Sequence, residues 1–207
     1  MKILITGGPT WVKIDEVRII TNIFTGKTAL FLAKYFKKRG CKVTLVLNTQ
    51  SIPKLPVNIR VIPFKYYQDL KNRLETELKK VKYNAIIHSA AISDYKLTKV
   101  FKGKISSEKR GLILKLVPTL KLIKMIRRLA KESFVVQFKL EINQSQLVDK
   151  AYHSLKKNST DLVVANSLID LKLGYRAFII DRNKNIKEVN SKKSLAANLF
   201  NHIKSTA

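Results

Sequence analysis

Apolar residues in the first part of the chain fall into short runs separated by longer amphipathic stretches. Runs with little polar alternation predict strands covered on both faces, at residues 2–6, 42–47, 58–64 and 84–89. Residues 26–39 and 67–80 place apolar side chains at helical spacing, and Gly40 supplies a stop for the first helix. This order of elements predicts a Rossmann-like α/β fold, an open, mostly parallel sheet with helices on both faces.

The pattern changes in the middle of the chain. Residues 93–110 are polar and basic without hydrophobic periodicity, and they are too many for a simple connection, which predicts a functional or mobile loop. Beyond them, strands are predicted at 112–116, 134–138 and 161–165, and helices at 119–131 and 144–157. The chain is predicted to close with a hairpin and a helix, over 177–181, 186–189 and 191–203. Because no linker or internal repeat interrupts this pattern, we expect residues 1–207 to form a single domain.

Composition excludes several classes of protein. Hydrophobic residues make up 45% of the chain, which is enough to build a core. No run of about eighteen apolar residues occurs and the N-terminus lacks a signal-peptide pattern, so we expect no membrane span and a cytoplasmic protein. Cys41 is the only cysteine, which excludes a disulfide framework and gives no metal cluster.

The charge is strongly positive, with 41 lysines and arginines against 14 acidic residues and a net charge of +27. Such a charge would attract nucleic acid, which we keep as an alternative function. The lysines are scattered, however, and no basic tail, RNA-binding signature or aromatic platform accompanies them. We therefore do not expect nucleic acid to be the partner, although the positive field would favour small anionic substrates.

Candidate binding residues follow the predicted strands, because open parallel sheets bind ligands beyond the carboxyl ends of their strands. Gly-Gly-Pro-Thr (7–10) follows the first strand, and Ser-Ala-Ala-Ile-Ser-Asp-Tyr (89–95) follows the fourth. Lys139 and Glu141, and then Asn166 and Ser167, follow two later strands. Small residues there allow a ligand to approach the backbone, and Asp94 would offer a carboxylate to hydroxyls, amines or a metal, or would only stabilise its loop.

The stretch over residues 17–27 is the most distinctive part of the chain. It delays the first helix by about fifteen residues after the glycines and carries Asn22, Thr25, Gly26 and Lys27. Unpaired N–H groups at a helix N-terminus favour a phosphate or another anion, and here a hydroxyl and a cation adjoin them. An ordinary helix cap and turn explains these residues equally well.

Known nucleotide and hydrolase motifs do not fit. A nicotinamide-dependent reductase, the second alternative, needs Gly-x-Gly-x-x-Gly at the first turn and an acid after the second strand, where this chain has Gly7-Gly8-Pro9 and Leu47-Asn48. Thr25-Gly26-Lys27 lacks the upstream glycine of a Walker A loop. No nucleophile elbow accompanies the three histidines.

Three separated groups of residues together resemble one family, phosphopantothenoylcysteine synthetase, in its stand-alone form. The first group is Gly-Gly-Pro-Thr (7–10) with residues 14–18, Thr21-Asn22 and Thr25-Gly26-Lys27. The second is residues 89–95, and the third runs from Gly103-Lys104-Ile105-Ser106-Ser107 to residues 114–118. Weaker agreement continues to Asn166, so the resemblance covers nearly the whole chain.

The resemblance implies a ligase of coenzyme A biosynthesis. A nucleoside triphosphate, CTP or ATP, would activate the carboxylate of 4′-phosphopantothenate as an acyl nucleotidylate in the presence of Mg²⁺. The amine of L-cysteine would then displace the nucleotide to form an amide. The family also pairs subunits, which implies a homodimer. No FMN is expected, because the chain has no flavin-dependent decarboxylase portion, and the metal ligands are not indicated.

Residue roles follow from the same resemblance. Asn22 and Lys104 would be catalytic, the first contacting the acyl phosphate intermediate and the second closing over the phosphates as a flap lysine. Asn22, Thr25 and Gly26 would bind the acid substrate. The nucleotide would contact Gly8, Thr10, His88, Ser89, Ala90, Asp94, Lys104, Leu120, Lys121, Leu122, Ile123, Phe138, His153 and Lys157. The choice between CTP and ATP stays open, because Ile105 and His153 stand where many members have further lysines.

Overall fold

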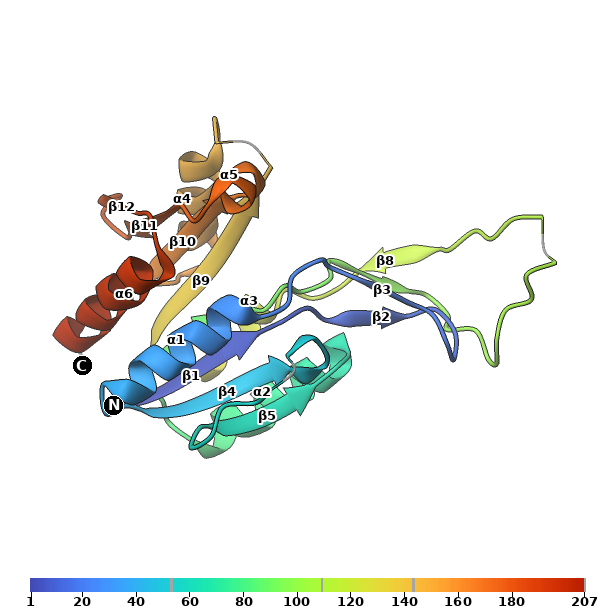
Figure 1. Ribbon diagram of the computed structural model, residues 1–207, viewed down its shortest axis with the longest axis horizontal. Helices are drawn as coiled ribbons and strands as arrows, with labels where there is room; N and C mark the ends of the chain where they lie inside the picture. The colour runs from blue at the N-terminus through green and yellow to red at the C-terminus, as the bar shows by residue number, and fades with distance from the viewer. Residues whose placement is uncertain (53, 109, 143, 207) are drawn as a thin grey trace.

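The computed structural model describes residues 1–52, 54–108, 110–142 and 144–206, so that Lys109 of the predicted loop lies outside the described residues. An eight-stranded sheet with helices on both faces forms the body, and a long arm extends from one end of it (Figure 1). The strand order is β12-β11-β10-β9-β6-β1-β4-β5. The six strands from β10 to β5 are parallel, while β11 and β12 run antiparallel, which confirms the predicted fold class.

The first strand of the chain, β1, lies in the interior of this sheet, between β6 and β4. In chain order the strands are β1 (Lys2–Gly7), β4 (Lys42–Asn48), β5 (Arg60–Phe64), β6 (Ala85–His88), β9 (Phe134–Glu141), β10 (Leu162–Ser167), β11 (Ala177–Asp181) and β12 (Ile186–Val189). After β5 the chain returns to pair β6 with the other side of β1. The direction of strand order therefore changes between β1 and β6, which is where open sheets leave a crevice for ligands.

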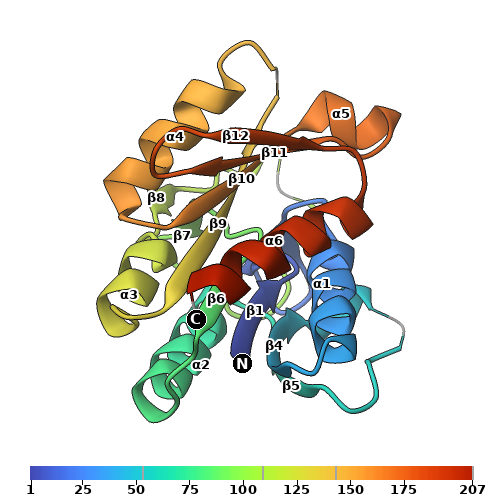
Figure 2. The same cartoon turned by 90° about the vertical axis from the view of Figure 1, so that its left-hand side faces the viewer.

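Helices cover both faces because strand side chains alternate between them. Ile3 and Ile5 of β1 share a core with α1 (Lys27–Lys38) and α6 (Lys192–Thr206), which lie side by side on one face (Figure 2). Leu4 points to the other face, where it packs with α2 (Tyr67–Lys80) and α3 (Leu122–Leu129). α4 (Leu147–Asn158) covers β10 and β11 on that same side. None of the helices described has the length and apolar character that a bilayer crossing requires.

The arm consists of two short hairpin-like pairs. β2 (Trp11–Lys13) pairs with β3 (Ile19–Thr21), and β7 (Tyr95–Leu97) pairs with β8 (Leu116–Pro118). Val12, Ile14, Leu97 and Ile105 are buried together between these pairs, so the arm has a small apolar core of its own. Segments about ninety residues apart in sequence therefore share one structural unit.

Several predicted boundaries are wrong, among them the end of β9 and the start of α4, and the largest single difference lies in this arm. The strand predicted at 112–116 is β8, which begins only at Leu116, and the helix predicted at 119–131 is shortened to α3. The cause is long-range pairing, because Pro118 pairs with Tyr95 and the backbone N–H of Thr119 donates to Asp94 O at 2.9 Å. β2, β3, β7 and the short helix α5 (Leu168–Leu173) were not predicted.

Candidate active site

A cavity of about 460 Å³ opens where β1, β6, β9 and β10 end, at the crevice expected from the strand order. Its walls come from the turns after these strands, from the start of α1 and from the segment that leads to α6. The predicted site residues that line it are Gly8, Thr25, Gly26, Ser89, Ala90 and Phe138. None of the described side chains along its walls is acidic, so the site favours a negatively charged ligand.

The start of α1 is held close to the first turn by glycine. Gly26 has a φ of 83°, and a Cβ atom at this position would lie 2.7 Å from the backbone nitrogen of Gly8. Neither a capping side chain nor an acidic residue occurs in the first turn of α1. The free N–H groups and the positive end of the helix dipole therefore face the cavity. This arrangement agrees with the anion site predicted from residues 17–27.

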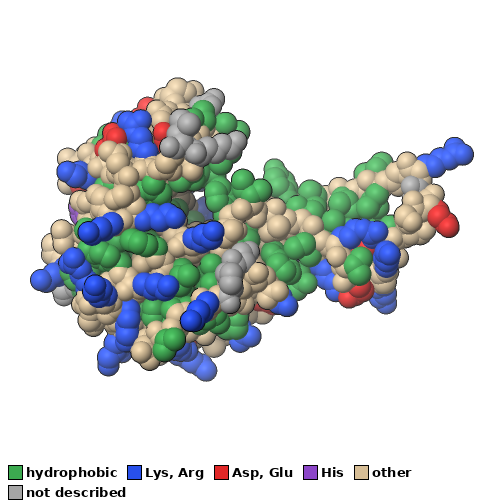
Figure 3. Space-filling model, viewed as in Figure 1, with side chains coloured by type: hydrophobic (Ala, Val, Ile, Leu, Met, Phe, Trp, Pro, Cys, Tyr) green, Lys and Arg blue, Asp and Glu red, His purple; other side chains and the backbone are tan. Residues whose placement is uncertain are grey.

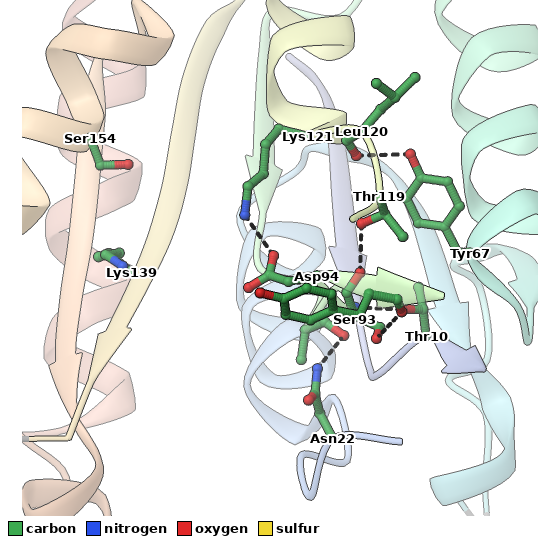
Figure 4. A network of polar contacts seen from close by, with 12 residues as sticks. Thr10, Asn22, Tyr67, Ser93, Asp94, Thr119, Leu120, Lys121, Lys139 and Ser154 are labelled. Atoms are coloured by element: carbon green, nitrogen blue, oxygen red, sulfur yellow. Dashed lines mark hydrogen bonds and ion pairs between the residues drawn. The ribbon is translucent and has the colours of Figure 1, made fainter. Parts of the chain in front are cut away.

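Asn22 connects the base of the arm to the edge of the cavity. Its side-chain nitrogen Nδ2 donates a hydrogen bond to the carbonyl of Ala91 at 3.1 Å (Figure 4). Ala91 lines the cavity, and its backbone also pairs with Gly8 and Thr10. A side-chain amide has a second N–H to donate, so Asn22 can bind Ala91 and still offer a donor to a ligand.

Asp94 lies outside the cavity wall and is paired with a lysine. The Asp94 carboxylate lies 2.6 Å from Lys121 Nζ, and both side chains are exposed (Figure 4). The neighbouring backbone is fixed by Thr10, whose hydroxyl accepts a hydrogen bond from Ser93 N at 2.8 Å. Asp94, Lys121 and Thr10 therefore form a second polar group beside the cavity, next to Asn22.

His88 is buried behind Ser89 and does not line the cavity. Its Nδ1 atom lies within hydrogen-bond distance of Thr6 Oγ1, at 2.9 Å. Thr6 Oγ1 accepts a hydrogen bond from Ala90 N, so its own proton is free to donate to Nδ1. Burial lowers the pKa of His88 to about 4, so the imidazole is neutral and supports the turn at Ala90.

This shift gives a pH dependence of stability. Below the ordinary histidine pKa the unfolded chain binds a proton that folded His88 rejects, so the free energy of unfolding falls as the pH decreases from about 6.5 toward 4. Between pH 7 and pH 5 we expect a loss of about 2 kcal/mol, measured by urea denaturation. The His88→Gln variant should lack this part of the slope. An equal slope in both proteins would show that His88 is not the group responsible.

The predicted nucleotide residues of α3 and α4 lie farther away. Leu122 and Ile123 are buried in the core against α2, so that their side chains are not exposed to a ligand. Leu120 is 75% exposed, and its carbonyl accepts a hydrogen bond from Tyr67. His153 and Lys157 are exposed on α4. None of these residues lines the cavity, and their predicted contacts with a nucleotide remain predictions.

Lys104 lies in the arm and is exposed. Its neighbours on both sides are tied to the β2–β3 turn, since Glu16 N donates to Gly103 O and Ile105 N donates to the Asp15 carboxylate. Asp15 is buried and also accepts from the backbone and guanidinium of Arg18. Burial acts to raise the pKa of Asp15, but these hydrogen bonds hold it well below the usual range. The arm thus fixes the position of Lys104, which does not line the cavity of its own chain.

A known protein family covers nearly the whole chain. The family described as "DFP: DNA/pantothenate metabolism flavoprotein C-terminal domain" matches residues 1–206. The chain belongs to this family. The resemblance drawn from the three sequence motifs is thereby confirmed at the level of the family.

Curated DFP-family relatives are longer than this chain. "Coenzyme A biosynthesis bifunctional protein CoaBC" of Thermococcus kodakarensis is 34% identical over 169 residues, which cover 81% of this chain and 41% of the relative. The protein of the same name from Methanocaldococcus jannaschii is 32% identical over 209 residues, which cover 98% of this chain and 50% of the relative. The chain therefore spans half or less of these two proteins.

Solved structures of the DFP family have the same fold. The crystal structure titled "DNA/Pantothenate Metabolism Flavoprotein" from Streptococcus pneumoniae superimposes with a TM-score of 0.89 at 28% identity, and the match covers 100% of both chains. A C-terminal domain of CoaBC gives a TM-score of 0.82 at 23% identity, covering 99% of this chain and 94% of that one, which supports the fold alone.

Among the residues that line the cavity, Lys139, Asn166, Tyr175 and Lys192 were absent from the residue roles that the family resemblance implied. Lys139 and Asn166 had a signal, because they follow predicted strands. Tyr175 and Lys192 had none, since they come from the segment before β11 and from the C-terminal helix, which the sequence pattern presents only as packing elements. The structure brings them to the cavity through the pairing of β11 with β10.

Proposed function

We propose that this chain is a ligase that joins 4′-phosphopantothenate to L-cysteine in coenzyme A biosynthesis. The observation that carries the proposal is the cavity at the ends of β1, β6, β9 and β10, into which α1 presents an uncapped N-terminus and whose described walls carry lysines but no acidic side chain. Such a site suits phosphorylated substrates. The names of the curated DFP-family relatives, which refer to coenzyme A biosynthesis, support this class of substrate.

The proposed reaction has two steps. The carboxylate of phosphopantothenate attacks the α-phosphorus of CTP or ATP, and pyrophosphate leaves. The amine of cysteine then attacks the acyl carbon of the mixed anhydride, the nucleoside monophosphate leaves, and the amine loses a proton. Neither step is an oxidation or a reduction, so the reaction as written requires no flavin.

Residues of the cavity would assist both steps by binding negative charge. The N-terminus of α1 with Lys27 and Thr25 would hold phosphate oxygens. Asn22 would donate its second N–H to the oxyanion that develops on the acyl group. The half-buried Phe138 and the small residues Ser89 and Ala90 would shape the wall and exclude water from the mixed anhydride.

Mg²⁺ would enter with the nucleotide. The part of the chain that the structure describes has no group of three or more His, Cys, Asp and Glu residues able to hold a metal ion. Mg²⁺ commonly uses phosphate oxygens and water with few protein carboxylates, which is compatible with this residue set. Its chemical contribution would be to neutralise the charge of the leaving pyrophosphate.

A homodimer would explain the arm. The arm exposes several apolar side chains, among them Val17 (63%), Ile19 (36%), Ile20 (37%) and Ile113 (94%). In Figure 3 apolar side chains run along the arm with lysines and arginines among them, and further lysines and arginines are spread over the body. Clustered exposed apolar residues are typical of a binding surface. We propose that two copies pair through their arms, and that this brings Lys104 of one subunit toward the cavity of the other.

The direct test measures pyrophosphate release with purified protein, Mg²⁺, phosphopantothenate, cysteine, and either CTP or ATP. We expect release that requires both the acid substrate and a nucleotide, with the amide product formed only when cysteine is present. The nucleotide that gives the higher rate of pyrophosphate release is identified as the natural co-substrate. Pantothenate without its phosphate serves as the control substrate. If neither nucleotide is consumed, the proposed function is wrong.

A further inference from the structure

The C-terminal part of the chain forms one wall of the cavity. Tyr175, between α5 and β11, and Lys192, at the start of α6, both line it. Lys192 Nζ lies 6.0 Å from the centre of the Tyr175 ring. At this distance the cation–π contact is weak, so the ammonium group is available to a stronger partner.

The hydroxyl of Tyr175 is the first observation that points to a ligand. It is buried, and among the residues described it has no hydrogen-bond partner. Burial raises the pKa of Tyr175 to about 12, and the nearby Asn166 side chain acts to lower it. The Asn166 amide nitrogen donates its hydrogen bond to Arg176 O at 3.0 Å, and it offers no acceptor for the Tyr175 proton. The hydroxyl is therefore a protonated donor at neutral pH. Buried polar groups in native proteins are nearly always paired, which suggests that a ligand oxygen supplies the missing acceptor.

The balance of charge is the second, independent observation. Lys139 also lines the cavity, but its ammonium is neutralised by Glu141 at 2.7 Å. No ion pair occurs for Lys192 or Lys27 within the ranges that the structure describes. The cavity thus contains two lysines whose charge is not compensated by a protein carboxylate. A concave site with this charge attracts anions.

We infer that Tyr175 and Lys192 bind phosphate oxygens of a substrate in this cavity, in addition to those held by the N-terminus of α1. The Tyr175 hydroxyl donates a hydrogen bond to a phosphate oxygen, and the Lys192 ammonium leaves the aromatic ring to pair with the phosphate charge. The inference rests on the proposed function for the identity of the substrate, since a nucleoside triphosphate and 4′-phosphopantothenate share this chemistry. It also assigns a binding role to the segment between α5 and β11 and to the start of α6.

Isothermal titration calorimetry of the full chain tests this wall. The ligands are CTP, ATP, 4′-phosphopantothenate and pantothenate, and the variants are Tyr175→Phe and Lys192→Met. We expect Lys192→Met to weaken binding of the phosphorylated ligand at least about 10-fold and Tyr175→Phe about 5-fold, as for lost hydrogen bonds to charged groups. Lys193→Met and Tyr152→Phe are matched controls, because Lys193 is the next and exposed residue of α6 and Tyr152 lies on α4. Both controls should bind like the wild type.

The pattern of losses decides between the two phosphate sources. A loss confined to CTP and ATP assigns the wall to the triphosphate, whereas a loss for phosphopantothenate but not pantothenate assigns it to the 4′-phosphate. The inference is overturned if both variants bind every ligand as the wild type does, if pantothenate loses as much affinity as phosphopantothenate, or if Lys193→Met has the same effect as Lys192→Met. A wild-type protein that binds none of these ligands would overturn it as well. Lys192-dependent phosphate binding without any amide product would contradict the proposed function but not this inference.

Discussion

Replacing Lys104 with alanine is expected to reduce kcat about 100- to 1,000-fold, which is the effect of removing one group that stabilises developing charge in a transition state. The loss should appear at saturating substrate, because the lysine would act on the phosphates only when the site closes. Gly103 O accepts a hydrogen bond from Glu16 N, and Ile105 N donates one to the Asp15 carboxylate. Removing the Lys104 side chain leaves both of these contacts intact. The measurement is steady-state pyrophosphate release.

Lys102→Ala is the matched control, since Lys102 lies in the same segment of the arm, is also exposed, and carries the same charge. It should keep nearly full activity. An unchanged kcat for Lys104→Ala, or an equal loss for Lys102→Ala, would exclude a specific role for Lys104. The arm would then contribute only a general electrostatic attraction for anionic substrates.

Mixing variants extends this test to the proposed dimer. If Lys104 serves the cavity of the partner subunit, a dimer of one Lys104→Ala chain and one Asn22→Ala chain contains one site that lacks both groups and one site that is intact. Co-refolding the two inactive variants at random gives half mixed dimers, each with one intact site, and half homodimers of a single variant. The mixture should therefore recover about a quarter of the wild-type activity. No recovery would mean that both residues serve the cavity of the same chain.

The body of the fold was predictable because its signals are local. The strands around β1 are short and continuously apolar, and α2 and the hairpin of β11 with β12 have the predicted bounds. Each of these elements is specified by its own residues, through apolar periodicity and turn chemistry. The crevice at the strand ends followed from the order of elements, and six of the predicted residues line the cavity.

The arm was not predictable because its signals are distant. Leu97 and Ile105 look like isolated apolar residues within a polar loop, yet they are buried against Val12 and Ile14. Their partners lie about ninety residues earlier, and no periodicity within either segment indicates the contact. The same limit applies to the site. Tyr175 and Lys192 reach the cavity only through the antiparallel pairing of β11 with β10, which adds the C-terminal part to the sheet.

Replacing Asn22 with alanine should abolish most amide formation while leaving nucleotide binding intact. We expect kcat to fall about 100- to 1,000-fold, because the lost amide N–H would have stabilised the oxyanion that forms when the amine of cysteine attacks the acyl carbon. The affinity for CTP or ATP should change by less than about 2-fold, since a group that acts on the transition state contributes little to ground-state binding. The fold should tolerate the change. Asn22 donates to Ala91 O at 3.1 Å, but this carbonyl also accepts from Thr10 N at 3.1 Å and so keeps a partner.

The comparison that isolates this role uses Thr21→Ala, which alters the adjacent and exposed residue of β3 at the base of the same arm. Thr21→Ala should retain wild-type kcat, and both variants should unfold within about 1 kcal/mol of the wild type, the usual contribution of one hydrogen bond. A loss of nucleotide affinity parallel to the loss of kcat would mean that Asn22 holds the turn at Ala91 in place and does not act on the acyl group. Because Asn22 contacts a residue of the cavity wall, this split between binding and turnover is the measurement that separates chemistry from positioning.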